Sequence, residues 1–206
     1  MLTIWGRANS TNVKKVLWTA QELGLDYESI AAGGAYGLVD EPAYRAMNPN
    51  GLVPTIRDGD FILWESNVIV RYLAARYGAG KLIPADLQAR AHAERWMDWS
   101  STTLAPPFRD MFWNLVRIAP EKRDMKAAEA GIARISALLP LLDAVLERQP
   151  FLTGDAFGIG DIPLGPMIYA WYALPIERPV LPHVEAWYHR LAERPAYRGA
   201  VMIPLS

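Results

Sequence analysis

The sequence predicts an α/β domain followed by an all-α helical bundle domain. In the first part, short apolar segments typical of strands alternate with segments whose apolar residues recur at helical spacing. The stretch from Gly78 to Pro84 breaks this pattern, and only helical spacing follows it. We therefore expect an α/β domain at residues 1–79, a linker at 80–86 and an all-helical domain at 87–206.

The first elements predict a βαβ unit. Leu2–Trp5 reads as a short strand, and a polar loop leads from it into a helix over Val13–Leu23 that Gly24 ends. Tyr27–Ile30 has the composition of a second strand. Two strands that flank a helix normally run parallel with a right-handed crossover.

The remainder of the first domain predicts a second helix, a hairpin and a third helix. Asp40–Met47 suggests an irregular helix, and Asp58-Gly59 is a strong turn signal between strands at Thr55–Arg57 and Phe61–Leu63. Helical spacing then continues from Val68 to Ala75. The expected order is β-α-β-α-β-β-α.

The second half predicts helices only. We expect Pro106-Pro107 to interrupt the first helical stretch and Pro140 to kink the second. The predicted helical stretches are Leu87–Arg117 (one helix or two), Asp124–Gln149, Gly160–Tyr172 and Pro182–Glu193.

Composition excludes several classes of function. The net charge is −1, with no long run of one sign, so we expect no nucleic-acid partner and no membrane association. The chain has no cysteine and only three histidines, which are not at metal-ligand spacing, so we expect no metal site. Because no apolar stretch reaches the length of a bilayer span, we predict a cytoplasmic protein.

Three segments carry the candidate chemistry. Val53-Pro54 ends a loop before a strand, where a cis bond would leave the Val53 main chain open to a bound peptide, although an ordinary loop proline gives the same pattern. Glu65-Ser66 comes where a strand meets a helix, so a carboxylate lies beside an anion-binding helix start, unless Ser66 is only an N-cap. Together they suit the zwitterionic end of a small peptide.

The third segment is the first strand-to-helix loop, which contains Ser10, Thr11 and Asn12. Open α/β sheets usually place their sites at such loops. A hydroxyl or amide donor there would stabilise a bound thiolate and lower the pKa of the thiol. The alternative is that these residues only cap the helix.

The three segments occur along the chain together with an all-helical second half. With this combination, the chain resembles the cytosolic glutathione transferase family, of the bacterial, serine-type or theta/nu-like kind. Asn48–Thr55 is similar to the family's cis-proline loop, and Glu65–Leu73 to its γ-glutamyl-binding junction. Phe151–Ile162 resembles its helix-capping segment, except that Gly158 replaces the usual Ser or Thr while Asp161 is kept. The resemblance implies a thioredoxin-like first domain.

The resemblance implies glutathione as a cosubstrate and residues that bind it. The Val53 main chain would hold the cysteinyl part, Glu65 and Ser66 the γ-glutamyl part, and Asn50 and Leu52 would border the glycyl end. The glutathione-binding residues implied are Asn50, Leu52, Val53, Pro54, Glu65 and Ser66.

The resemblance also implies a residue that activates the thiol and a pocket for a small hydrophobic electrophile. Ser10 aligns with the serine of serine-type members, and Asn12 with an asparagine of some disulfide-reducing relatives. The apolar side chains expected in the pocket belong to the long helix after the linker, where the alternative for each is a core position. The expected pocket residues are Trp5, Arg7, Phe108, Met111, Phe112, Trp113 and Arg117.

Three functions remain open. A transferase involved in detoxification would use Ser10, a disulfide or peroxide reductase using two glutathione molecules would depend on Asn12, and a binding protein would keep the site without turnover. The resemblance implies a homodimer that buries part of 62–64 and of the helices after Leu87, and that could bring Asp98 near the partner's glutathione site.

Overall fold

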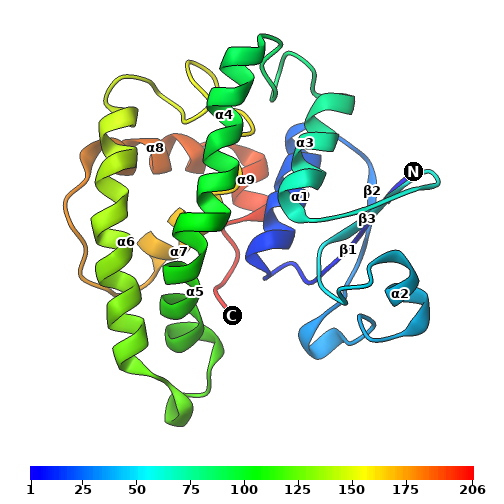
Figure 1. Cartoon of the computed structure of the whole chain (residues 1–206), viewed down its shortest axis with the longest axis horizontal. Coiled ribbons are helices and arrows are strands. Elements are labelled where there is room, and N and C mark those ends of the chain that lie inside the picture. The colour runs from blue at the N-terminus through cyan, green and yellow to red at the C-terminus, as the bar shows by residue number, and fades with distance from the viewer.

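Four short strands form one mixed sheet in the computed structural model, which describes residues 1–206 (Figure 1). The strand order is β2-β1-β3-β4, with β1 and β2 parallel and the other pairs antiparallel. The predicted order of elements is confirmed. The elements are β1 (Leu2–Trp5), α1 (Thr11–Glu22), β2 (Tyr27–Ile30), α2 (Pro42–Met47), β3 (Thr55–Asp58), β4 (Phe61–Trp64) and α3 (Ser66–Tyr77).

The two faces of the sheet are covered differently. Ile4 and Ile56 are fully buried in the main core with α1 and α3, whereas Trp5 packs with Tyr44 of α2 in a separate small cluster. Side chains alternate along a strand, so Ile4 and Trp5 must point to opposite faces. The hairpin turn lies at Gly59-Asp60, one residue after the predicted turn, because Asp58 still pairs with Phe61.

The second domain is helical throughout, as predicted. Pro106-Pro107 do not interrupt the long helical stretch, because they lie at the start of α5, just after a π-helical turn at Ser100–Leu104, where prolines are tolerated. Pro140 lies inside α6, which stays helical on both sides of it. The helices are α4 (Leu87–Trp99), α5 (Ala105–Phe112), α6 (Met125–Leu146), α7 (Gly165–Ala173), α8 (Pro182–Ala192) and α9 (Pro195–Ala200).

The segment before α7 differs from the prediction. The helix begins at Gly165 rather than Gly160, and the turns before it surround the fully buried Asp161. The Asp161 carboxylate accepts the expected bond from the Gly158 N–H at 3.1 Å and also bonds Thr153 and Trp187 Nε1. These partners hold the chain in turns, so the helix starts later than its spacing suggests. The short α9 was not predicted.

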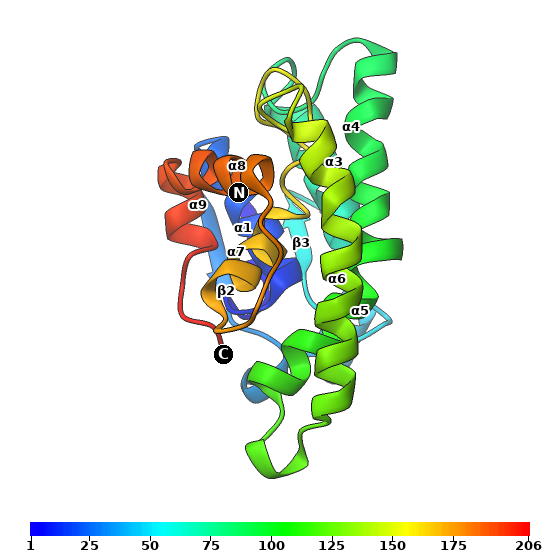
Figure 2. The same ribbon diagram turned by 90° about the vertical axis from the view of Figure 1, so that its left-hand side faces the viewer.

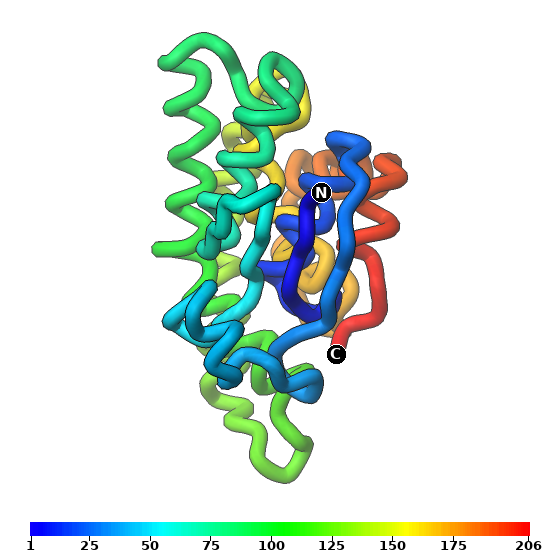
Figure 3. The backbone as a smooth tube through the Cα atoms, turned by 90° about the vertical axis from the view of Figure 1, so that its right-hand side faces the viewer, coloured from blue at the N-terminus to red at the C-terminus, as the bar shows by residue number.

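The two domains share one core. Trp18 of α1 is fully buried between Phe157 and Tyr197 of the second domain, with ring centroids 5.1 and 4.7 Å away. Arg194 adds two hydrogen bonds of 2.7 Å to Glu22. Figure 2 shows α6 running beside α4 and α5, and Figure 3 shows the last helices beside the first domain. No helix is long and apolar enough to cross a membrane.

Candidate active site

The sheet register brings the three predicted segments to one edge. Thr55 pairs with both Trp5 and Trp64, so β1 and β4 end where β3 begins. The Gly6–Ser10 loop, Val53-Pro54 and Glu65-Ser66 therefore follow or precede the strands at the same end of the sheet. This is the site position that an open sheet favours.

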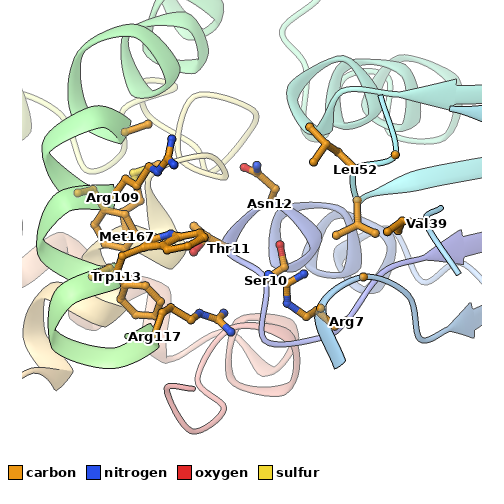
Figure 4. A pocket seen from close by; sticks show the side chains of 17 residues that line it. Arg7, Ser10, Thr11, Asn12, Val39, Leu52, Arg109, Trp113, Arg117 and Met167 are labelled. Carbon is orange, nitrogen blue, oxygen red and sulfur yellow. The ribbon is translucent and has the colours of Figure 1, made fainter. Parts of the chain in front are cut away.

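A cavity of about 560 Å³ lies between this edge and α5 (Figure 4). Ser10 and Asn12 lie between Leu52 on one wall and the α5 side chains on the other. Most of the predicted pocket residues come together here, with Val39, Arg109 and Met167 as additions. The predicted residues that line the cavity are Arg7, Ser10, Asn12, Leu52, Val53, Phe108, Phe112, Trp113 and Arg117.

Ser10 and Asn12 both have free side chains at the start of α1. Ser10 is the N-cap residue, but its hydroxyl makes no capping bond, and the Asn12 amide has no partner within the chain. Ser10 therefore retains a donor that faces the cavity, beside the partially positive N-terminus of a helix. Either side chain can donate a hydrogen bond to an anionic sulfur placed here.

A buried hydrogen-bond network holds the loop at Val53-Pro54, whose peptide bond is cis. The Tyr44 hydroxyl donates to the Leu52 carbonyl at 2.6 Å, and Asn48 Nδ2 donates to the same oxygen at 2.9 Å. Pro54 is buried beneath the loop and does not line the cavity. Asn50 does not line it either, because its main-chain and side-chain nitrogens both bond Asn48 Oδ1 at 3.1 Å.

Glu65 and Ser66 follow β4 at the same end of the sheet but do not line the cavity. The N-cap position of α3 belongs to Glu65, whose φ of 76° is unusual for a residue other than glycine, and Ser66 is the first helical residue. No side chain caps this helix, so its first N–H groups are available to an anion. The strained backbone at Glu65 is typical of a ligand-binding position.

Lys15 of α1 lies beneath this helix start and was missed from the sequence. It is 2% exposed, and its Nζ is 3.5 Å from Ser66 Oγ and 3.3 Å from Asn67 Oδ1. Burial lowers the pKa of Lys15 to about 8, while the nearby Glu65 carboxylate raises it. Nothing in the local sequence pattern indicated that a charged side chain would be buried there.

Trp5 and Met111 are corrections to the predicted pocket. Trp5 lies on the far face of the sheet, with its ring under the Arg57 guanidinium, so it does not reach the cavity. Met111 is fully buried where α5 meets α6, and a methyl group added at Gly131 would lie 3.2 Å from its Cβ. Arg109 was missed, although it precedes Trp113 and Arg117 by one and two helical turns.

Comparison with known proteins gives the same family for both halves of the chain. The family models "Glutathione S-transferase, N-terminal domain" and "Glutathione S-transferase, C-terminal domain" match residues 6–81 and 95–195. Glutathione S-transferase GstB of Escherichia coli (strain K12) is 50% identical over 208 aligned positions, covering 100% of both chains. Glutathione S-transferase 3 of Zea mays is 33% identical over 164 residues, covering 78% of this chain and 73% of the maize protein.

A solved structure agrees over the whole length. The theta class glutathione S-transferase of Xanthomonas axonopodis pv. citri, crystallised with glutathione bound, has a TM-score of 0.97 and 54% identity. The match covers 100% of this chain and 99% of that chain. With both halves matched and a full-length relative at 50% identity, this chain belongs to the glutathione S-transferase family.

Proposed function

We propose that this protein binds glutathione, stabilises its thiolate and transfers it to a hydrophobic electrophile. The sulfur forms a bond to an electrophilic carbon, and the leaving group departs with the electron pair of the bond that breaks. The observation that carries the proposal is the cavity, where the free donors of Ser10 and Asn12 face an aromatic wall across a space open to a peptide. Family membership supports the same activity.

Glutathione would lie along the sheet edge. The Val53 main chain would pair with the cysteinyl residue, as a peptide pairs with an exposed strand. The uncapped start of α3 and Ser66 would bind the γ-glutamyl carboxylate, and the exposed Glu65 carboxylate would bind its amine. Leu52 would border the glycyl end. Asn50 and Pro54 would act indirectly, by shaping the loop.

Ser10 is the proposed activating residue. Its hydroxyl would donate a hydrogen bond to the thiolate, which stabilises the anion and lowers the pKa of the thiol. Asn12 is the alternative donor, because its amide also lines the cavity without a partner. A role for Asn12 would favour the reductase, in which a second glutathione supplies the remaining electrons.

The ultraviolet absorbance of the thiolate, followed against pH with glutathione bound, tests this assignment. The thiol pKa should be depressed in the wild type and should rise by about one to two units in Ser10→Ala. The matched variant Asn12→Ala should keep the wild-type titration. If the shift instead persists in Ser10→Ala and disappears in Asn12→Ala, then Asn12 is the activating residue. Glutathione that binds with an unshifted pKa would contradict the transferase.

We also propose a homodimer and a cytoplasmic, detoxifying role. The dimer is supported by apolar side chains exposed on β4, where Ile62 is 38% and Trp64 37% exposed. Asp98 is exposed on α4, where it forms an ion pair with Arg71 of α3 at 2.5 Å, and we propose that it lies near the partner's glutathione site in the dimer. Cell fractionation and growth in the presence of electrophiles would test the location and the role.

A further inference from the structure

Three arginines line the cavity without any acidic residue to balance them. The 17 lining residues include Arg7, Arg109 and Arg117 but no aspartate or glutamate. Most ion pairs of the chain are formed by arginines, including Arg45, Arg71 and Arg194. None of the three cavity arginines has a carboxylate partner. The cavity therefore concentrates positive charge that nothing in the chain neutralises.

The arginines come from both walls of the cavity, and two of them, Arg7 and Arg117, lie close enough to interact. Arg7 belongs to the first domain, where a methyl group added at Gly33 would lie 3.1 Å from Arg7 Nη1. Arg117 bonds only the Asn9 carbonyl, at 2.8 Å. Burial and then the Arg7 charge lower the pKa of Arg117, and burial and then the Arg117 charge lower the pKa of Lys14. Like charges held together in this way favour a bound anion.

Aromatic rings hold two of the guanidinium groups in place. Arg109 lies over the Trp113 ring at 5.3 Å, and Arg117 over the Phe112 ring at 5.5 Å. A π-helical turn over Trp113–Arg117 extends this helix past α5. Such turns are frequent at functional sites. Asp110 lies on α5 next to Arg109 but faces a separate groove with Thr102 and Arg134.

The apolar part of the wall is suited to a flat ring. Phe108 and Phe112 are stacked with centroids 5.4 Å apart, and Met167 lies in the same wall. An aromatic body can pack on these side chains while a charged substituent reaches the guanidinium groups. A neutral electrophile could also use the aromatic wall, but it would not need the guanidinium groups.

We infer that the preferred electrophile is an organic anion, namely an aromatic body that carries a carboxylate. This inference rests on the proposed transferase function. Arg117 would bind the carboxylate with the Arg7 charge across from it, and Arg109 would add its charge from the other end of the aromatic wall (Figure 4). The carboxylate takes no part in the bond changes. In an aryl chloride of this kind, the sulfur bonds to the ring carbon, the C–Cl bond breaks, and chloride leaves with its electron pair.

A matched pair of electrophiles tests the inference. 4-Chloro-3,5-dinitrobenzoate carries the charge, and its methyl ester has the same reacting carbon without it. For each compound, kcat/KM is divided by its uncatalysed rate constant with glutathione, which removes the difference in intrinsic reactivity. We expect the wild type to favour the carboxylate by at least about tenfold, as one charge-assisted hydrogen bond allows.

Two variants and a control locate the effect. Arg117→Gln should reduce the carboxylate-to-ester ratio by about tenfold, and Arg109→Gln should reduce it by less, because its charge acts from farther away. Arg134→Gln removes an exposed arginine of the neighbouring groove and should keep the wild-type ratio. Added salt should also lower the wild-type preference, because it screens charges.

The outcomes separate this inference from the proposed function. A wild type without preference for the carboxylate, or a preference that survives both substitutions, overturns the anionic substrate while leaving a transferase. A raised KM for glutathione with an unchanged ratio would assign the arginines to the glycyl carboxylate of glutathione and would also overturn it. Turnover of neither compound above the uncatalysed rate would instead contradict the transferase itself.

Discussion

Lys14 and Lys15 are neighbours in the sequence, but their ammonium groups lie in different parts of the molecule. Lys15 Nζ lies under the Ser66 end of α3, while Lys14 Nζ donates to the Val201 carbonyl at 2.8 Å and lies over the Tyr169 ring. Both are buried, and burial lowers the pKa of each to about 8. Only Lys15 is placed to act on a carboxylate bound at the start of α3.

We therefore predict that Lys15→Met raises the KM for glutathione by about three- to tenfold, because one buried positive charge beside the γ-glutamyl carboxylate is lost. Lys14→Met is the matched control and should leave that KM unchanged. Initial-rate kinetics with saturating electrophile measure both values. Equal increases in the two variants would mean that either substitution only disturbs α1.

The pH dependence of KM for Lys15→Met and wild type tests whether the Lys15 charge is responsible. Lys15 is protonated below its pKa of about 8, so its contribution is present there and is lost as the pH rises through that value. The ratio of the KM values for Lys15→Met and wild type should therefore fall toward one above pH 8. The titration of glutathione itself cancels in this ratio. A ratio that is constant with pH would contradict a role for the Lys15 charge.

Single residues of the site differ in how far the sequence predicts them. Ser10 and Val53 follow from local motifs, since the strand end and the loop fix their positions within a few residues. Trp5 was expected in the pocket, but it lies on the face of the sheet opposite to its core neighbour Ile4, as the alternation of side chains along a strand requires. The place of Arg109 in the cavity depends on which side of α5 faces the first domain, and no local sequence pattern indicates that side.

Among the elements, the long helical stretch after the linker shows that apolar spacing predicts a helix but not which side chains face the cavity. Regular 3.6-residue spacing groups Met111 with Phe108 and Phe112, yet Met111 packs against α6 and the two phenylalanines face the cavity. The π-helical turns at Ser100–Leu104 and Trp113–Arg117 change the rotation of the side chains along the helix. The helical stretch was therefore predicted, but the directions of its side chains were not.

The start of α7 depends on Asp161, whose carboxylate connects the loop after α6 with α8. It accepts bonds from the Leu152 N–H at 2.7 Å, the Gly158 N–H at 3.1 Å and Trp187 Nε1 at 2.9 Å. Burial raises the pKa of Asp161, and these donors oppose that effect. The residue thus ties the loop after α6 to α8.

We predict that Asp161→Asn lowers the free energy of unfolding by about 2–4 kcal/mol, because an amide cannot accept all of these bonds and leaves buried donors unpaired. Urea unfolding followed by tryptophan fluorescence measures the change. Asp155→Asn, an exposed aspartate in the same loop, is the control and should stay within about 0.5 kcal/mol of wild type. Similar losses in both variants would contradict a special role for Asp161.

For the molecule as a whole, the site exists because two domains share a core. The first domain supplies the donors and the peptide-binding edge, and the second supplies the aromatic and basic wall. Trp18, packed between Phe157 and Tyr197, fixes α1 and with it Ser10 against the second domain. The sequence predicted each domain, but their relative position, and so the composition of the cavity, comes from this packing.

The exposed apolar side chains on the first domain lead to the last prediction. Phe61, Ile62 and Trp64 lie on β4, the edge strand of the sheet, and Val68 follows on α3. Exposed apolar groups gathered on an edge strand normally mark an interface, since an uncovered edge invites pairing. We expect two copies of the chain to bury this surface around a two-fold axis.

Trp64→Glu should therefore convert the dimer to a monomer, because a charge would be buried at the contact without a partner. Light scattering after size-exclusion chromatography gives the mass directly. Val180→Glu, at a side chain that is 89% exposed in the connection between α7 and α8, tests whether any exposed apolar position has this effect, and it should leave the dimer intact. A wild-type monomer would contradict the dimer, and a Trp64→Glu dimer would place the contact elsewhere on the molecule.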